Sequence, residues 1–146
     1  MERFKRKYLT ALLCLLFTIK PCFAEVKKIR CTIQGTKDAY STGFWGTYLG
    51  QYNVQDTLDY YIDDTNKTIL TGSSKYKLKT TGFTRNDIFV EHLFELPDIK
   101  QLQKIHIDRV NGTIEYHANT QIKSKKIMDS IYATGSCVPI TNKNKF

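Results

Sequence analysis

The 146-residue sequence has few cysteines, one tryptophan and three prolines, and it has one long apolar run, Leu9–Ile19. That run is too short to span a bilayer, and no second apolar stretch is long enough, so we expect no stable membrane insertion of the mature chain. The sequence also lacks a phosphate-binding glycine loop, a dinucleotide fingerprint, a Gly-x-Ser-x-Gly elbow and an HExxH motif. It therefore offers no support for nucleotide-dependent enzymes, serine hydrolases or zinc proteases of the common types.

The first 24 residues are typical of a secretory signal. A basic head between Arg3 and Lys7 precedes the apolar run, and Cys22-Phe23-Ala24 places small residues three and one before a cleavage point. Bulky or charged residues precede Cys14 and Cys22, which argues against lipid attachment. We therefore expect a signal peptide over 1–24 and a single β-rich exported domain over 25–146, in the periplasm or outside the cell.

The charge of the mature chain is only mildly basic. The whole sequence carries a formal charge of +8, but five basic residues and one acidic residue belong to the expected signal peptide. The remainder has 17 basic and 13 acidic residues, a net charge of +4. Such a charge favours anionic partners weakly. Because no basic motif is interleaved with aromatic residues, we expect no nucleic-acid partner.

Two of the four cysteines, Cys31 and Cys137, lie in the expected mature chain. In an exported protein two cysteines most simply form one disulfide. This disulfide would close a loop of about 100 residues, worth roughly 4 to 5 kcal/mol in the chain-entropy model. The alternative is two buried free thiols. No histidine lies near either cysteine in the sequence, so a catalytic thiol is not supported.

Short β-like runs alternate with turn signals along the mature chain, and no stretch sustains a helical apolar stripe with caps. This pattern predicts an all-β fold, an antiparallel meander forming a small barrel or sandwich. One short helix remains open for Lys123–Ser130, and we find no internal repeat. The expected strands are Val26–Gln34, Leu58–Ile62, Thr68–Thr71, Lys75–Thr81, Ile88–Phe94, Lys104–Arg109, Thr113–Ala118 and Ile131–Val138.

Five aromatic residues gather among glycines between residues 36 and 53. Glycines disfavour a helix there, so we interpret the segment as an aromatic-rich loop or a bent strand. Its exposed rings would suit a sugar or a protein partner, and in the alternative reading the bulky residues plug one end of a barrel. The candidate binding residues are Tyr40, Phe44, Trp45, Tyr48 and Tyr52.

The hairpin around Asn111-Gly112 is the one place where titratable side chains converge. With these two residues as the turn, His106 faces His117 and Asp108 faces Glu115, on the face opposite the neighbouring isoleucines. Two imidazoles and two carboxylates at cross-strand spacing can chelate a divalent metal such as Zn²⁺. The alternative is a solvated polar face, and on that reading the protein needs no cofactor.

The segment Ile107-Asp108-Arg109-Val110-Asn111-Gly112, followed later by Gly135-Ser136-Cys137, resembles a pattern in short exported bacterial proteins of unknown function. Those proteins usually carry a hydroxyl residue where Asn111 stands here. The resemblance covers only the last part of the chain. It implies a small β-rich exported domain and no activity, with structural roles for Asp108, which would bond turn amides, and Arg109, which would cover the hairpin.

Together these features favour an exported, non-enzymatic binding or interaction protein. Its partner would be a protein, a glycan or a small ligand. One alternative is a metal-binding protein or metal-dependent hydrolase that uses the His106 and His117 face. Another is an inhibitor of a secreted enzyme, although a basic chain suits a basic target such as lysozyme poorly.

Overall fold

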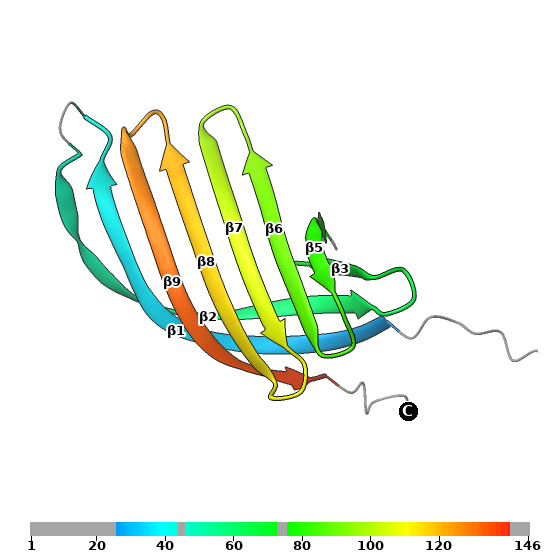
Figure 1. Ribbon diagram of the computed structural model, residues 1–146. Coiled ribbons are helices and arrows are strands. Elements are labelled where there is room, and N and C mark those ends of the chain that lie inside the picture. Colours follow the sequence, from blue (N-terminus) through cyan, green and yellow to red (C-terminus); the bar gives the residue numbers. More distant parts are fainter. Residues whose placement is uncertain (1–25, 44–45, 73–75, 141–146) are drawn as a thin grey trace, which may run out of the picture.

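The computed structural model describes residues 26–43, 46–72 and 76–140, and these form a single antiparallel β-sheet without a helix (Figure 1). The all-β prediction is therefore confirmed. The predicted signal peptide, residues 1–24, lies outside the described residues. The strands are β1 (Val26–Ser41), β2 (Tyr48–Asp63), β3 (Thr68–Thr71), β4 (Tyr76–Leu78), β5 (Thr80–Phe83), β6 (Asp87–Glu95), β7 (Ile99–Asp108), β8 (Thr113–Ile122) and β9 (Ile127–Pro139).

The sheet is nearly closed into a barrel. Its strand order is β4-β3-β2-β1-β9-β8-β7-β6-β5, so the first and last strands pair in the middle. The outer strands β4 and β5 follow each other directly, and the amide of Glu91 in β6 donates to the carbonyl of Lys79 between them, at 3.1 Å. The strand predicted over Lys75–Thr81 is thus divided at Lys79.

In the ranges 26–43, 46–72 and 76–140, strand pairing closes one end of this barrel and not the other. Among the described residues, β2 pairs with β3 over Tyr60–Asp63 alone, and the earlier part of β2 pairs only with β1. Figure 1 shows β6 to β9 side by side, with β6 and β8 running upward and β7 and β9 downward, while the lower parts of β1 and β2 cross behind β6 to β8. The two ends of the barrel therefore differ: one is capped by short strands and turns, and the other opens between β2 and β6.

The core fills the closed end of the barrel. Alternate residues of each strand face inward, as a half-buried sheet requires. Each fully buried aliphatic side chain contributes about 1.5 to 3 kcal/mol of hydrophobic stabilisation. The buried cluster consists of Cys31, Ile33, Tyr60, Ile62, Ile69, Leu78, Ile88, Val90, Ile105, Ile107, Ile114 and Ala133.

The segment Lys123–Ser130 is not a helix. The chain turns over Lys123–Lys126, with Lys126 in the left-handed region at φ 51°, and β9 begins at Ile127 opposite Ile122. The helical alternative is wrong because pairing with β8 favours an extended backbone. Likewise, no helix in the described part of the chain is long and apolar enough to cross a membrane.

Cys31 and Cys137 form the predicted disulfide. The two residues lie directly opposite each other in the β1–β9 ladder, 106 residues apart in sequence, and Cys31 is fully buried. The bond joins the first strand to the last in the middle of the sheet. A disulfide of this kind points to a non-reducing environment.

Removal of the disulfide should destabilise the fold strongly. We expect Cys31→Ala to lower the free energy of unfolding by roughly 2 to 5 kcal/mol, because the unfolded chain gains the freedom of a long open loop. Urea denaturation of both proteins measures the difference. Peptide mapping without reductant should recover Cys31 and Cys137 as one linked peptide, and free thiols in the native protein would contradict the assignment.

Two glycines allow β1 and β9 to approach where both strands curve. A Cβ atom on Gly35 would collide with the carbonyl oxygen of Tyr132, and one on Gly135 with the carbonyl oxygen of Thr32. Both obstacles are backbone atoms of the neighbouring strand, which no side-chain rotation can relieve. Gly135 is also the first residue of the Gly-x-Cys pattern. The pattern therefore contains both the glycine that the close strand contact needs and one cysteine of the disulfide.

The substitution Gly135→Ala should lower the free energy of unfolding by about 3 kcal/mol, at the upper end of overpacking effects. Gly82→Ala is the matched control. Its added Cβ would meet only the Phe89 side chain, at 3.1 Å, so we expect a loss below about 1 kcal/mol. Thermal or urea unfolding compares the two, and equal losses would show that the β1–β9 approach is not tight.

Two turns at the closed end have the same construction, which is a short internal repeat that we did not expect from the sequence. In each, an aspartate Oδ1 accepts bonds from the amides two and three residues later, and its Oδ2 accepts from an asparagine side chain. These hydrogen bonds lower the pKa of Asp63 and of Asp108. The role implied for Asp108 by the resemblance is the one observed. The paired segments are Ile62–Ile69 and Ile107–Ile114.

The residues that follow these two aspartates pair with each other. Arg109 Nη1 lies 2.8 Å from Asp64 Oδ1, and Arg109 Nη2 donates to Asp64 Oδ2 at 3.0 Å. Equivalent positions of the repeat thus carry opposite charges and join the β2–β3 turn to the β7–β8 turn. Arg109 does more than cover its own hairpin, since it holds two distant parts of the sheet together.

Candidate functional site

The β7–β8 hairpin has a four-residue turn, Arg109–Gly112, instead of the predicted two-residue turn. Asp108 pairs with Thr113, His106 with Glu115 and Lys104 with His117. The predicted register was wrong by two residues, because Asp108 bonds the turn amides and closes the turn earlier. A shift of two residues keeps each side chain on its face. The predicted outward face is therefore preserved, although its cross-strand partners change.

The four proposed metal ligands do not form a square in this register. The Asp108 carboxylate is engaged in the turn, and His117 faces Lys104. His106 Nε2 lies 2.9 Å from Asp87 Oδ1, and its Nδ1 lies 3.9 Å from Glu115 Oε2. In the part of the chain that the structure describes, no three His, Cys, Asp or Glu side chains are grouped to hold a metal ion. Metal binding here stays an untested alternative.

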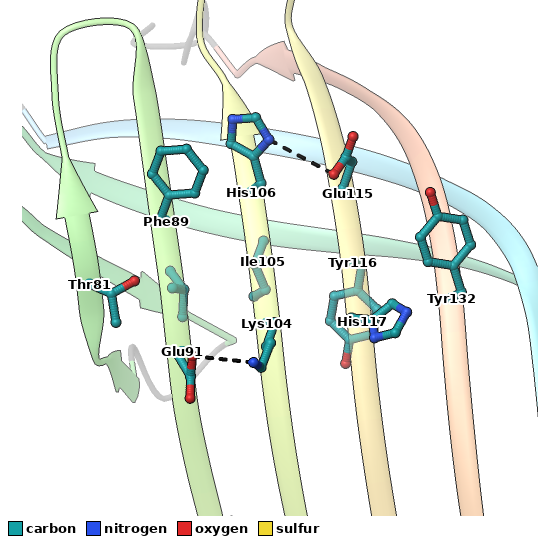
Figure 2. A pocket seen from close by; sticks show the side chains of 11 residues that line it. Thr81, Phe89, Glu91, Lys104, Ile105, His106, Glu115, Tyr116, His117 and Tyr132 are labelled. Carbon is teal, nitrogen blue, oxygen red and sulfur yellow. Dashed lines mark ion pairs between the residues drawn. The ribbon is translucent and has the colours of Figure 1, made fainter.

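These histidines instead line a shallow groove on the outer face of the sheet, called the outer groove below (Figure 2). It has a volume of about 300 Å³ and crosses four neighbouring strands, β6 to β9, beside β5. Inward-facing residues of the same strands form its floor. The side chains that line it from the outer face are Thr81, Phe89, Glu91, Lys104, His106, Glu115, His117 and Tyr132.

Aromatic rings stand at both ends of the outer groove. The Phe89 and His106 rings are stacked with centroids 4.4 Å apart and planes 7° apart, and the His117 and Tyr132 rings meet edge to face at 5.2 Å. Figure 2 shows Phe89 at one end and Tyr132 at the other. Stacking limits the motion of these rings, so the groove presents flat apolar surfaces at fixed places.

Charged side chains lie between the rings. Lys104 Nζ is 3.5 Å from Glu91 Oε2, and Glu115 reaches toward His106 (Figure 2). The side chains of Glu91 and Glu115 are 49% and 64% exposed. The groove thus offers hydrogen-bond acceptors and one ammonium donor beside its rings, all of them in contact with solvent.

The predicted aromatic segment lies at the open end of the barrel, away from the outer groove. Tyr40 belongs to β1 and Tyr48 to β2, and their rings contact at 5.4 Å across a register shift, as a bent strand implies. Tyr48 and Tyr52 are more than half exposed. Phe44 and Trp45 lie outside the described residues, so the reading that they plug a barrel end is not tested.

The sequence singled out three residues of the outer groove, His106, Glu115 and His117. It did not point to the aromatic residues at the two ends of the groove, Phe89 and Tyr132. Phe89 alternates with buried Ile88 and Val90, so its outward direction was readable from the pattern. Nothing local places Phe89 and Tyr132 on one surface, because β6 and β9 are separated by two strands. The third described histidine, His92, lies on the inner face of β6, where its Nδ1 accepts from the Lys79 amide at 3.2 Å.

Comparison with known proteins adds no family to this picture. No family model, no curated protein and no solved structure matches the chain.

The metal hypothesis has a direct test. We expect Zn²⁺ in a few-fold excess to leave the melting temperature unchanged, because His106 is bonded to Asp87 and His117 lies opposite Lys104. A metal that binds only the folded chain would raise it. A rise that His106→Ala and His117→Ala each abolish would contradict this expectation, and the metal-dependent alternative would then lead.

Proposed function

We propose that this chain is an exported, non-enzymatic binding domain whose ligand lies across the outer groove. The main support for this proposal is that exposed rings and charged side chains from four adjacent strands lie together on one surface. Ligand sites combine apolar walls with a few placed polar groups in this way. The signal-like residues 1–24 and the disulfide support export to the periplasm or beyond the cell.

A glycan suits the outer groove better than a strongly apolar ligand. Sugar rings present flat C–H faces that pack on aromatic rings, and their hydroxyls bond to carboxylates and ammonium groups. Phe89 on β6 and Tyr132 on β9 are three strand spacings apart, about 14 Å. That length fits a short oligosaccharide laid across the strands, with Lys104 and Glu115 between the two ends.

The exposure of the groove carboxylates favours binding over hydrolysis of such a ligand. A glycosidase needs one carboxyl group whose pKa is raised by burial, so that it can act as an acid. The Glu91 and Glu115 side chains are about half exposed or more, so neither carboxyl group is buried. The other charged groups are already paired, Lys104 with Glu91 and His106 with Asp87.

A second candidate is an inhibitor of a secreted enzyme. The observation that favours it is a set of exposed apolar side chains near the open end of the barrel. Aromatic and apolar side chains of this kind are enriched at protein interfaces. These side chains, on β2, on β6 and just after β6, are Tyr48, Leu49, Tyr52, Leu93 and Leu96.

The glycan proposal is tested by titrating the ¹⁵N-labelled protein with tetra-N-acetylchitotetraose and with maltotetraose. We expect one of them to shift the amide signals of Phe89, His106, His117 and Tyr132. The substitution Tyr132→Ala should weaken that binding by about tenfold, through the loss of a stacking surface. Tyr52→Ala is the matched control: Tyr52 is 56% exposed against 52% for Tyr132 and lies outside the groove.

Two outcomes would contradict the glycan proposal. In the first, neither oligosaccharide shifts the groove signals. In the second, Tyr52→Ala weakens binding as much as Tyr132→Ala does, which would move the site to the open end and favour the second candidate.

A further inference from the structure

A second groove lies at the closed end of the barrel, and we call it the basic groove. It has a volume of about 580 Å³ and forms where the start of β1 meets the β2–β3, β5–β6 and β7–β8 turns. It shares no lining residue with the outer groove. Its lining consists of Lys27, Asp64, Lys67, Phe83, Thr84, Arg85 and Arg109.

The basic groove carries an excess of positive charge. Four of its residues are basic and one is acidic, a net charge of +3. The single carboxylate, Asp64, is already shared: it pairs with Arg109 at 2.8 Å and with Lys27 at 3.2 Å. Arg109, and then Lys27, lower the pKa of Asp64, so this carboxylate is ionised near neutral pH. The +4 of the expected mature chain is thus largely concentrated here.

Two cations of the basic groove have no acidic partner in the part of the chain that the structure describes. Among the residues that the structure describes, no carboxylate oxygen lies within 4.0 Å of the Lys67 or Arg85 side chain. In contrast, Lys28 and Arg30 on β1 share Asp59. Unpaired cations at the rim of a concave site raise the local concentration of anions.

The floor of this groove is preorganised. Arg109 donates to the Thr84 carbonyl at 3.2 Å, its guanidinium lies 5.8 Å from the Phe83 ring centroid, and only 18% of its side chain is exposed. The Arg109 amide also donates to the Asn86 carbonyl, at 2.7 Å. Three turns are therefore fastened to one another before any ligand arrives, which lowers the entropy cost of binding.

The repeated turn also fixes the position of Lys67, one of the two basic residues without a described acidic partner. Lys67 occupies the left-handed position of the β2–β3 turn, with φ 50°, and Gly112 occupies the same position of the β7–β8 turn, with φ 65°. Glycine adopts this conformation without steric cost, whereas a lysine there is uncommon. The Lys67 position therefore adds to the groove a cation that the usual residue would not supply.

We propose that the basic groove binds a phosphate-bearing ligand, which Lys67 and Arg85 contact while the Arg109–Asp64 pair positions the turns. A phosphate group carries up to two charges and three strong acceptor oxygens, which several cationic donors can satisfy together. The groove is large for a single phosphate ion and has room for a diphosphate. The phosphate can belong to a soluble compound or to a lipid headgroup.

Calorimetric titration of the oxidised protein with sodium pyrophosphate at low ionic strength tests the site. We expect binding that weakens as salt is added, because the groove is open to solvent. The double variant Lys67→Asn, Arg85→Gln should raise the dissociation constant by about tenfold or more. Asparagine is chosen at residue 67 because it tolerates the left-handed backbone.

The matched control is the double variant Lys77→Gln, Lys100→Gln. It removes the same charge from residues outside the basic groove. In about 0.1 M salt, where exposed charges more than about 10 Å apart are largely screened, we expect its dissociation constant to change by less than about twofold. No binding of pyrophosphate, or an equal loss in both double variants, would overturn the proposal.

Cosedimentation with phosphatidylglycerol vesicles separates the two sources of phosphate. Pyrophosphate binding without vesicle binding identifies a soluble ligand. Vesicle binding that pyrophosphate displaces, and that Lys67→Asn, Arg85→Gln weakens, identifies a lipid headgroup. Vesicle binding that pyrophosphate fails to displace would place lipid elsewhere on the protein and overturn the headgroup source. Because the two grooves share no residue, failure here leaves the glycan proposal intact.

Discussion

The close contact between β1 and β9 is the constraint on which the rest of the structure depends. These two strands occupy the middle of the sheet, with three strands beyond β1 and four beyond β9. Gly35 and Gly135 remove the side chains that would keep them apart, and Cys31–Cys137 joins them covalently. Without this contact the sheet would separate into two smaller sheets with long unpaired edges, which are prone to aggregate. The basic groove would be lost, since it draws on β1 and the β2–β3 turn from one side and on the β5–β6 and β7–β8 turns from the other.

The alternation of residues along the strands was enough to predict which faces are buried. The isoleucines of the β7–β8 hairpin were expected on the face opposite His106 and His117, and Ile105, Ile107 and Ile114 pack together in the core. The same pattern could not fix the hairpin register, because a shift of two residues leaves every face unchanged. The Asp108 carboxylate decides the register. Its hydrogen bonds to the turn amides stabilise a four-residue turn in place of the two-residue turn that the Asn111-Gly112 pair predicts.

The candidate sites were less predictable than the fold, because each combines residues from distant strands. The basic groove joins Asp64 to Arg109, 45 residues later, and only the order of strands brings them together. The aromatic segment was hard to assign for a different reason. Its glycines suggested a loop, yet β1 continues through Tyr40 to Ser41, because pairing with both β2 and β9 supports an extended chain.

The disulfide joins the first strand of the sheet to the last, and the outer ends of these two strands also meet. The amide of Ile140 donates to the carbonyl of Lys28 at 2.8 Å, so the start of β1 and the end of β9 lie side by side. If those ends were joined and the chain opened at Lys79, the strands would follow one another across the sheet in unbroken sequence order. The fold is thus a circular permutation of a simple up-and-down meander. Oxidation of two thiols supplies the covalent link between β9 and β1 that a hairpin turn supplies between other neighbouring strands.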